Sequence, residues 1–275
     1  MSGADTQTAA IASKRRRFGL RSLISRRPAV AGLISFAVIV AVWEFVWATH
    51  LVERGLVPSP QQVFERFWVL LTKHGLIFDM YMSSYRVLMG VLFGILFAVP
   101  VGFALGWYRP IRAFADPVIN FFRALPPIAL IPLVIVYFGI GEFAKISLLF
   151  YAAFFSGVIV MYEGIKSVNP TYVRVARVLG ADDSEIFLKV IVPVTLPHAL
   201  TAVRVAMGVA WTALVAAELV AAQRGLGAVI VDGQNYFQVD TIYVGIILIG
   251  TVALTMDKVL RALSARLVAW QETLS

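Results

Sequence analysis

The sequence contains no cysteine among its 275 residues. Because disulfides and thiolate metal sites both need cysteine, neither can occur in this protein. Charged residues are also scarce, at 15% of the chain against roughly 25% in an average soluble domain. Apolar residues reach 60%. A disordered chain lacks so much apolar surface, and a water-soluble domain would expose large apolar patches, so the composition predicts an integral membrane protein.

Long stretches without charge indicate how many helices cross the membrane. A transmembrane helix needs about 20 mostly apolar residues. The sequence predicts an all-α fold with six such spans, at roughly residues 28–49, 84–107, 116–139, 144–163, 197–221 and 241–262. These spans form a predicted transmembrane domain over 28–270, preceded by a basic tail over 1–27. Between the first two spans, Val63, Phe67, Leu70 and Leu71 recur at helical spacing and predict a short amphipathic helix.

The basic residues give an orientation to these spans. Most of the 24 Lys and Arg residues fall in segments on the same side as the N-terminus. Because positive charge is enriched in cytoplasmic loops, both termini are predicted to be cytoplasmic. The net charge of +8 is spread over four inner segments rather than gathered in one stripe with aromatics, which argues against nucleic-acid binding.

The long inner connection between the fourth and fifth predicted spans has strong helix signals. Asn169 before Pro170 predicts a helix start, and Gly180 predicts the end of a short helix over 171–179. Asp182 with Glu185 three residues later predicts a capping box at the start of a second helix. Pro193 and Pro197 are expected to close that second helix before the fifth span. From the residues alone, this two-helix element is a docking element for a partner, a solvated loop hairpin or an interfacial helix pair.

A family resemblance favours the docking element. The run from Ala176 through Gly180 to Val190 and Pro193 resembles the cytoplasmic signature of binding-protein-dependent ABC importer permeases. That signature reads Glu-Ala-Ala, three residues, Gly, nine residues, Ile, any residue, Leu-Pro. Arg174 and Val175 stand where the family has Glu and Ala. Two further stretches, 123–142 and 211–227, resemble the nitrate/taurine/aliphatic-sulfonate branch.

The resemblance implies a type I ABC importer permease fold and a homodimer in the inner membrane of a bacterium. It implies two separate ABC ATPases that bind ATP and Mg, a periplasmic solute-binding protein, and no cofactor or ATPase site in this chain. The transported solute would be small and anionic, like a sulfonate, taurine or nitrate. The ATPase would contact a coupling loop over 168–193, with these residues implied: Arg174, Ala176, Gly180, Ala181, Asp182, Glu185, Val190 and Pro193.

Charged residues inside predicted spans are costly and mark functional sites or structural pairs. Arg123, next to Pro126 and Pro127, either attracts an anionic solute or pairs with a lipid phosphate, Asp116 or Glu218. The candidate pathway or gate residues are Arg123, Pro126, Pro127, Trp211 and Glu218.

Three further charged residues are assigned from their positions in the predicted spans. Glu218 either gates the outer mouth or pairs with Arg224. Arg204 is expected to pair structurally or to reach toward the interface. Glu44, near Trp43 and Trp47, is expected at the membrane interface.

A stripe of small residues recurs every four positions in the second predicted span. It comprises Gly90, Gly94, Ala98, Gly102 and Gly106. Such a stripe lets two helices approach closely, so it predicts a packing face within the subunit or across a dimer.

Two other function classes compete with an importer subunit. A stand-alone ion-coupled secondary transporter would show inverted repeats and paired broken helices, and the sequence has no matching second half. An intramembrane enzyme would need a nucleophile with a base, or paired carboxylates, and no such motif is evident. The importer subunit is therefore the favoured function.

Overall fold

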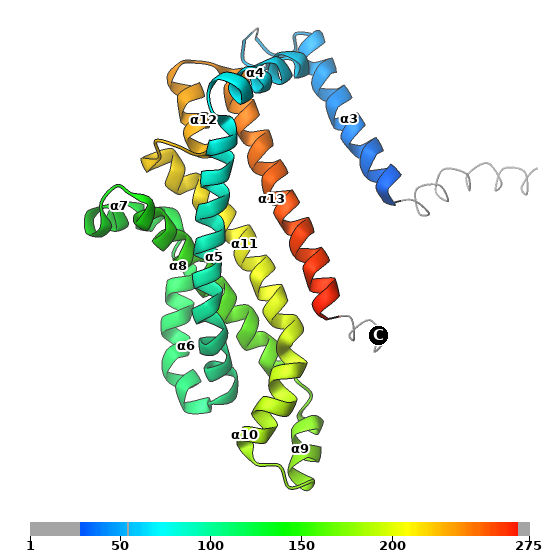
Figure 1. Cartoon of the computed structure of the whole chain (residues 1–275), viewed down its shortest axis with the longest axis vertical. Coiled ribbons are helices and arrows are strands. Elements are labelled where there is room, and N and C mark those ends of the chain that lie inside the picture. The colour runs from blue at the N-terminus through cyan, green and yellow to red at the C-terminus, as the bar shows by residue number, and fades with distance from the viewer. Residues whose placement is uncertain (1–27, 54, 269–275) are drawn as a thin grey trace, which may run out of the picture. The chain divides into compact units, whose positions relative to one another are not determined.

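The computed structural model describes residues 28–53 and 55–268 (Figure 1). The chain forms two compact units, Met1–Glu65 and Arg66–Ser275. The basic tail predicted over 1–27, and the last two residues of the predicted transmembrane domain, lie outside the described residues. All regular structure in the described residues is helical, in agreement with the all-α prediction.

The first unit contains α3 (Pro28–Ala48), which covers the first predicted span. Its part from Ile34 to Ala48 is apolar but shorter than a full span. Glu44 is exposed on α3. The indole Nε1 of Trp43 donates to the carbonyl oxygen of Pro58 at 3.0 Å, so the chain after α3 folds back to the helix.

The predicted amphipathic helix is present as α4 (Pro60–Lys73). Ser59 and Gln62 cap its start reciprocally: the Ser59 hydroxyl accepts from the Gln62 amide at 3.1 Å, and the Gln62 side chain accepts from the Ser59 amide at 2.8 Å. Val63 and Leu70, seven residues apart on one face, are both buried. The sequence periodicity therefore gave the correct helix and the correct buried face.

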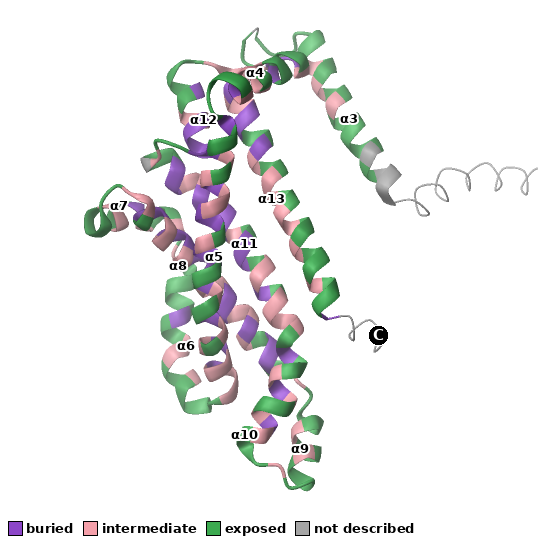
Figure 2. Ribbon diagram, viewed as in Figure 1, coloured by how far each residue is buried: buried purple, intermediate pink, exposed green. Residues whose placement is uncertain are grey.

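Four long helices of the second unit are apolar enough to cross a membrane: α5 (Leu76–Trp107), α8 (Glu142–Lys166), α11 (Val192–Ala221) and α13 (Val239–Leu267). α5 packs along α8, and α8 packs on α11. Figure 2 shows buried residues concentrated among these three helices and exposed residues on the outward faces of α6 and α13. Exposed leucines such as Leu92, Leu96 and Leu254 suit an apolar solvent rather than water.

The small-residue stripe of α5 faces α8 of the same chain. A Cβ atom at Gly94 would lie 2.6 Å from the Cβ of Ala153, and one at Gly106 would lie 2.6 Å from Cγ2 of Ile165. Both distances are too short for real side chains, so the helices can touch only because these positions are glycine. The predicted packing face is confirmed, and it lies within the subunit.

The predicted third span over 116–139 is broken into two helices. The segment forms α6 (Arg109–Ala124) and α7 (Pro127–Phe138), bent by 94° at the break. Leu125 is extended, with ψ 120°, because the ring of the following proline disfavours helical backbone angles at the residue before it. Pro126 and Pro127 also lack the amide proton that would continue the helical hydrogen bonds. If this bent pair counts as one span, the described residues contain five spans, and otherwise four.

The inner connection contains α9 (Pro170–Val178) and α10 (Asp183–Ile186). The expected end of the second helix at Pro193 and Pro197 is wrong. A π-helical turn, Phe187–Ile191, joins α10 to α11 without a break. In this turn the amide of Val192 donates to the carbonyl of Phe187, five residues back, and this wider winding accommodates Pro193, which has no amide proton.

α12 (Leu226–Asn235) follows α11 after a short loop and packs on α13. The pair α9 and α10 lies at the end of α11 remote from α12 (Figure 1). The second unit therefore has two distinct ends, one with the α9–α10 hairpin and one with α12.

Gly94→Ala tests the α5–α8 contact. The added methyl group must push the two helices apart, and such overpacking costs about 1–3 kcal/mol. We expect a lower thermal unfolding temperature in detergent. Gly250→Ala on α13 is the matched control, because a Cβ there meets nothing within 4 Å. Equal stability of the two variants would contradict the close-packing role.

Candidate functional site

The hairpin of α9 and α10 is shaped by the predicted capping residues. The Asn169 side chain accepts from the Thr171 amide at 2.9 Å. Asp182 accepts from the Glu185 amide at 2.7 Å, and the Glu185 carboxylate accepts from the Asp182 amide at 3.4 Å, which completes the capping box. These contacts satisfy amides that would otherwise be unpaired at the two helix starts. The two helices are therefore held by local hydrogen bonds.

The turn between the two helices depends on Gly180, whose φ is +86°. This left-handed conformation is open to glycine at little cost, and it lets the Ala181 amide donate to the Ala176 carbonyl at 3.0 Å. Exposed Arg177 and Asp183 form an ion pair across the turn at 3.0 Å. Exposed ion pairs contribute little, so the glycine conformation sets the angle between the helices.

A buried cluster anchors the hairpin to the long helices. Ile165, Ile186 and Ile191 form its centre. The ring of Phe187 packs against Phe103 of α5, with centroids 5.4 Å apart. Ala176, Ala181 and Val190 of the predicted coupling loop pack against this cluster, so their role here is to fix the hairpin on its base.

The tip of the hairpin presents apolar surface. Val178 is 87% exposed and Leu179 is 80% exposed. Exposed Arg174 lies on the same helix and donates to Thr171 at 3.3 Å. The sequence prediction did not include Val178 and Leu179, although they directly precede Gly180. The end of the hairpin therefore carries two exposed apolar side chains.

A second site lies at the α12 end of the bundle, around a fully buried arginine. Arg86 on α5 is 1% exposed. Its Nε and Nη2 donate to both carboxylate oxygens of Glu142 at 2.6 and 2.7 Å, and its Nη1 donates to Glu218 of α11. Lys145 adds a second cation, 3.0 Å from Glu142. A buried charge is tolerated only when paired and hydrogen-bonded, and here the pairing joins α5, α8 and α11.

The same side chains hold the loop between α11 and α12. Arg86 also donates to the Arg224 carbonyl at 2.7 Å. The amide of Gly225 donates to Asp79 at 3.0 Å, and the amide of Gly227 donates to Glu218 at 2.8 Å. We call Asp79, Ser83, Arg86, Glu142, Lys145 and Glu218 the Arg86 cluster. Because its acceptors bind backbone amides, the cluster fixes the course of the chain from 224 to 227.

The predicted pair between Glu218 and Arg224 is wrong. α11 ends at Ala221, so Arg224 does not lie on the next turn of that helix. Its guanidinium instead lies 3.9 Å from Asp79. Arg86 is not among the site residues predicted from the sequence. A signal was present, because polar residues at 79, 83 and 86 lie on one face of a helix.

Arg123, at the α6–α7 break, lines a cavity of about 280 Å³. Pro127, Tyr151 and Ser156 also line it. Among the residues that the structure describes, no carboxylate pairs with Arg123, so the expected pairs with Asp116 and Glu218 are absent. Asp116 accepts from Asn120, and Glu218 belongs to the Arg86 cluster.

The remaining pathway candidates are placed differently. Pro126 is exposed at the start of α7. Trp211 on α11 is buried and does not line the cavity beside Arg123. Arg204 pairs with Asp257 of α13 at 3.2 Å, as expected for a structural pair.

Residues 90–269 match the family described as the binding-protein-dependent transport system inner membrane component. The chain belongs to this family. It is 45% identical over 240 residues to a probable ABC transporter permease protein of Brucella abortus (strain 2308), covering 87% of this chain and 95% of the relative. It is 35% identical over 260 residues to the taurine transport system permease protein TauC of Escherichia coli (strain K12), covering 93% and 94%.

Comparison with solved structures supports the same fold. The permease resembles a chain of the methionine ABC transporter MetNI in an inward-facing conformation, with a TM-score of 0.57 at 22% identity. The match covers 68% of this chain and 95% of the other. The resemblance to ABC importer permeases and to their nitrate/taurine/sulfonate branch is confirmed. The chain is a permease subunit of an ABC importer, and the family favours this function over a stand-alone secondary transporter.

Arg86→Gln tests the buried cluster. The substitution leaves the buried carboxylate of Glu218 without its cation, which costs about 3–5 kcal/mol. We expect a large fall in unfolding temperature of the purified permease. The matched control is Arg204→Gln, because its pair with Asp257 is partly exposed and worth about 0–1 kcal/mol. The double variant Arg86→Met/Glu218→Gln should recover part of the loss, and strictly additive losses would contradict direct pairing.

Proposed function

We propose that this permease is a six-span subunit, with both termini in the cytoplasm, that forms the pathway of an importer as a homodimer. Residues 1–27 form a cytoplasmic tail and 28–270 the transmembrane domain. A periplasmic binding protein delivers a small anionic solute, and two separate ATPase subunits bind ATP and Mg. This chain itself holds no cofactor and carries out no hydrolysis.

The observation that carries this proposal is the anchored hairpin, with Gly180 in the left-handed conformation and apolar Val178 and Leu179 at its tip. A groove on an ATPase would receive this tip. The continuous helical segment Asp183–Val220 then transmits a rigid movement from the hairpin to Glu218. Since Glu218 belongs to the Arg86 cluster, the movement reaches the loop before α12. ATP-driven closure of the ATPases would in this way change access at the far end of α11.

The anionic character of the solute is supported by Arg123. Its guanidinium has no carboxylate partner among the described residues and faces a cavity next to a broken helix. The planar fork of arginine fits oxyanions in two-point contact. Broken helices near the midplane are typical of solute pathways, since they expose backbone groups to the passage. The relative TauC is named for taurine, which carries a sulfonate group. Glu218, buried and fully engaged, is proposed as an anchor of the outer loop.

Gly180→Val tests the coupling role. A β-branched residue is strained at φ +86°, by about 1–3 kcal/mol, so the hairpin tip should change shape. We expect roughly tenfold or greater loss of ATPase co-purification, whereas the permease's unfolding temperature should fall no further than in a control variant with a similar backbone strain. Gly139→Val is the matched control, since Gly139 also has positive φ but lies outside the hairpin. Normal ATPase binding by the Gly180 variant would refute the proposal.

Arg123→Gln tests the solute pathway. Loss of the cation should reduce ATP-dependent uptake of taurine in proteoliposomes to about a tenth or less, since a charge-assisted contact contributes about 1.5–3 kcal/mol. ATPase binding should be unchanged. Arg109→Gln, on the same helix away from the cavity, is the control. Normal uptake by the Arg123 variant would remove Arg123 from the pathway, and uptake driven by an ion gradient without ATP would refute the importer.

A further inference from the structure

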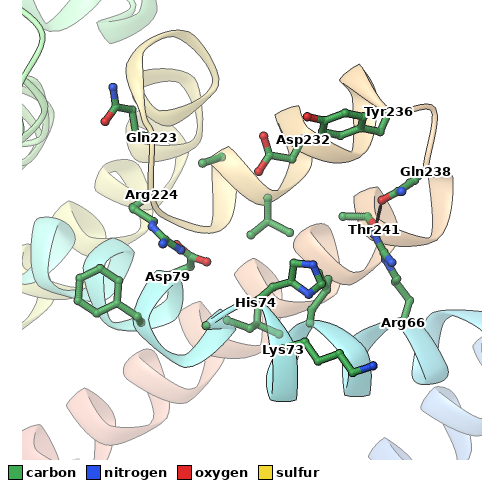
Figure 3. A pocket seen from close by; sticks show the side chains of 16 residues that line it. Arg66, Lys73, His74, Asp79, Gln223, Arg224, Asp232, Tyr236, Gln238 and Thr241 are labelled. Carbon is green, nitrogen blue, oxygen red and sulfur yellow. Dashed lines mark hydrogen bonds and ion pairs between the residues drawn. The ribbon is translucent and has the colours of Figure 1, made fainter.

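A large pocket opens at the α12 end of the permease (Figure 3). Its volume is about 770 Å³, which is within the range of small-molecule sites. The end of α4, the start of α5, the loop after α11, α12 and the start of α13 form its walls. Under the proposed function this end, opposite the hairpin, faces the periplasm. The pocket is separate from the cavity beside Arg123, with which it shares no lining residue.

Arg66 enters this pocket from α4 and is held there by uncharged groups. Its Nε donates to the hydroxyl of Thr241 at 2.7 Å, and its Nη2 donates to the side-chain oxygen of Gln238 (Figure 3). Thr241 is only 2% exposed, so its hydroxyl is a fixed acceptor. Among the described residues no carboxylate pairs with Arg66. The guanidinium is therefore oriented without a direct ion pair, and the carboxylate of Asp240 lies one hydrogen bond away, through the Thr241 hydroxyl. Arg66 keeps further N–H donors for a ligand.

The other charges make the α4 wall of the pocket positive. Lys73 lies seven residues after Arg66 on the same helix face, and it too has no carboxylate partner in the described part of the chain. The charge of Arg224 is offset by Asp79, 3.9 Å away. Asp232 is the remaining carboxylate of the lining, and it lies across the pocket from Lys73 (Figure 3). A ligand between these walls is attracted by two cations and repelled by one carboxylate.

We propose that this pocket binds a small oxyanion of the sulfonate or sulfate type through Arg66 and Lys73. In the importer it is a first holding site for solute released by the binding protein, before the cavity beside Arg123. That role rests on the proposed function, whereas oxyanion binding by the pocket does not. Thr241 and Gln238 are positioning residues, because they act through Arg66.

The test uses the full-length permease with its ATPase in nanodiscs that contain only zwitterionic lipid, titrated with ethanesulfonate by calorimetry. Arg66→Gln should weaken binding by about tenfold or more, because a charge-assisted contact is lost. Lys73→Gln should weaken it severalfold. Asp232→Asn should strengthen binding, because a like charge is removed, and a misfolded protein cannot produce that gain. Lys258→Gln, an exposed cation at the other end of α13, is the control and should change nothing.

The outcomes separate this proposal from the function of the importer. Arg123→Gln should still bind ethanesulfonate at the Arg66 pocket while losing uptake. Unchanged affinity in both Arg66→Gln and Asp232→Asn would overturn the site. Binding that is displaced when phosphatidylglycerol is included would assign the pocket to a lipid phosphate and overturn the solute role. Unchanged ethanesulfonate affinity in Arg66→Gln, with reduced ATPase stimulation by the binding protein, would make the pocket a protein contact and overturn the proposal.

Discussion

Arg86 is the residue on which the α12 end of the permease depends. A guanidinium that is 1% exposed inside a membrane bundle needs both charge compensation and a full set of acceptors. Glu142, Glu218 and the Arg224 carbonyl supply them from three different segments. Because each acceptor comes from another element, the position of α5 determines where α8, α11 and the following loop can lie. The loop between α11 and α12 is thus tied to the helix core by charge and hydrogen bonds.

The two ends of the permease are connected by one long helical segment. The π-helical turn after α10 continues the helix where the prolines predicted a break, so α10 and α11 form one uninterrupted helical segment. At one end the aromatic contact of Phe103 with Phe187 fixes the hairpin to α5, and at the other end Glu218 meets Arg86, also on α5. The helical segment that joins the hairpin to the α12 end therefore contacts α5 near both of its ends.

Features that depend on neighbours in sequence were predictable. The caps at Asn169 and Asp182, the glycine turn at Gly180 and the amphipathic helix α4 all agree with the structure, because each depends on contacts within a few residues. The proline pair at 126 and 127 indicated a break but not its angle of 94°. The predicted pair of Glu218 with Arg224 is wrong, and the described residues contain no carboxylate pair of Arg123, since a charged side chain inside a span can contact whichever helix packs beside it.

By itself, the sequence determined that this is a helical membrane protein, because composition and periodicity are local properties of the chain, and its motifs resemble those of the importer permease family. Only the tertiary structure decided that Arg86 compensates Glu142 and Glu218, and that Arg66 from α4 meets Thr241 and Gln238 near α13. Residues 66 and 241 lie far apart in the chain, and no periodic pattern links them. Their meeting depends on how the helices pack, and packing depends on the glycines that let α5 and α8 touch.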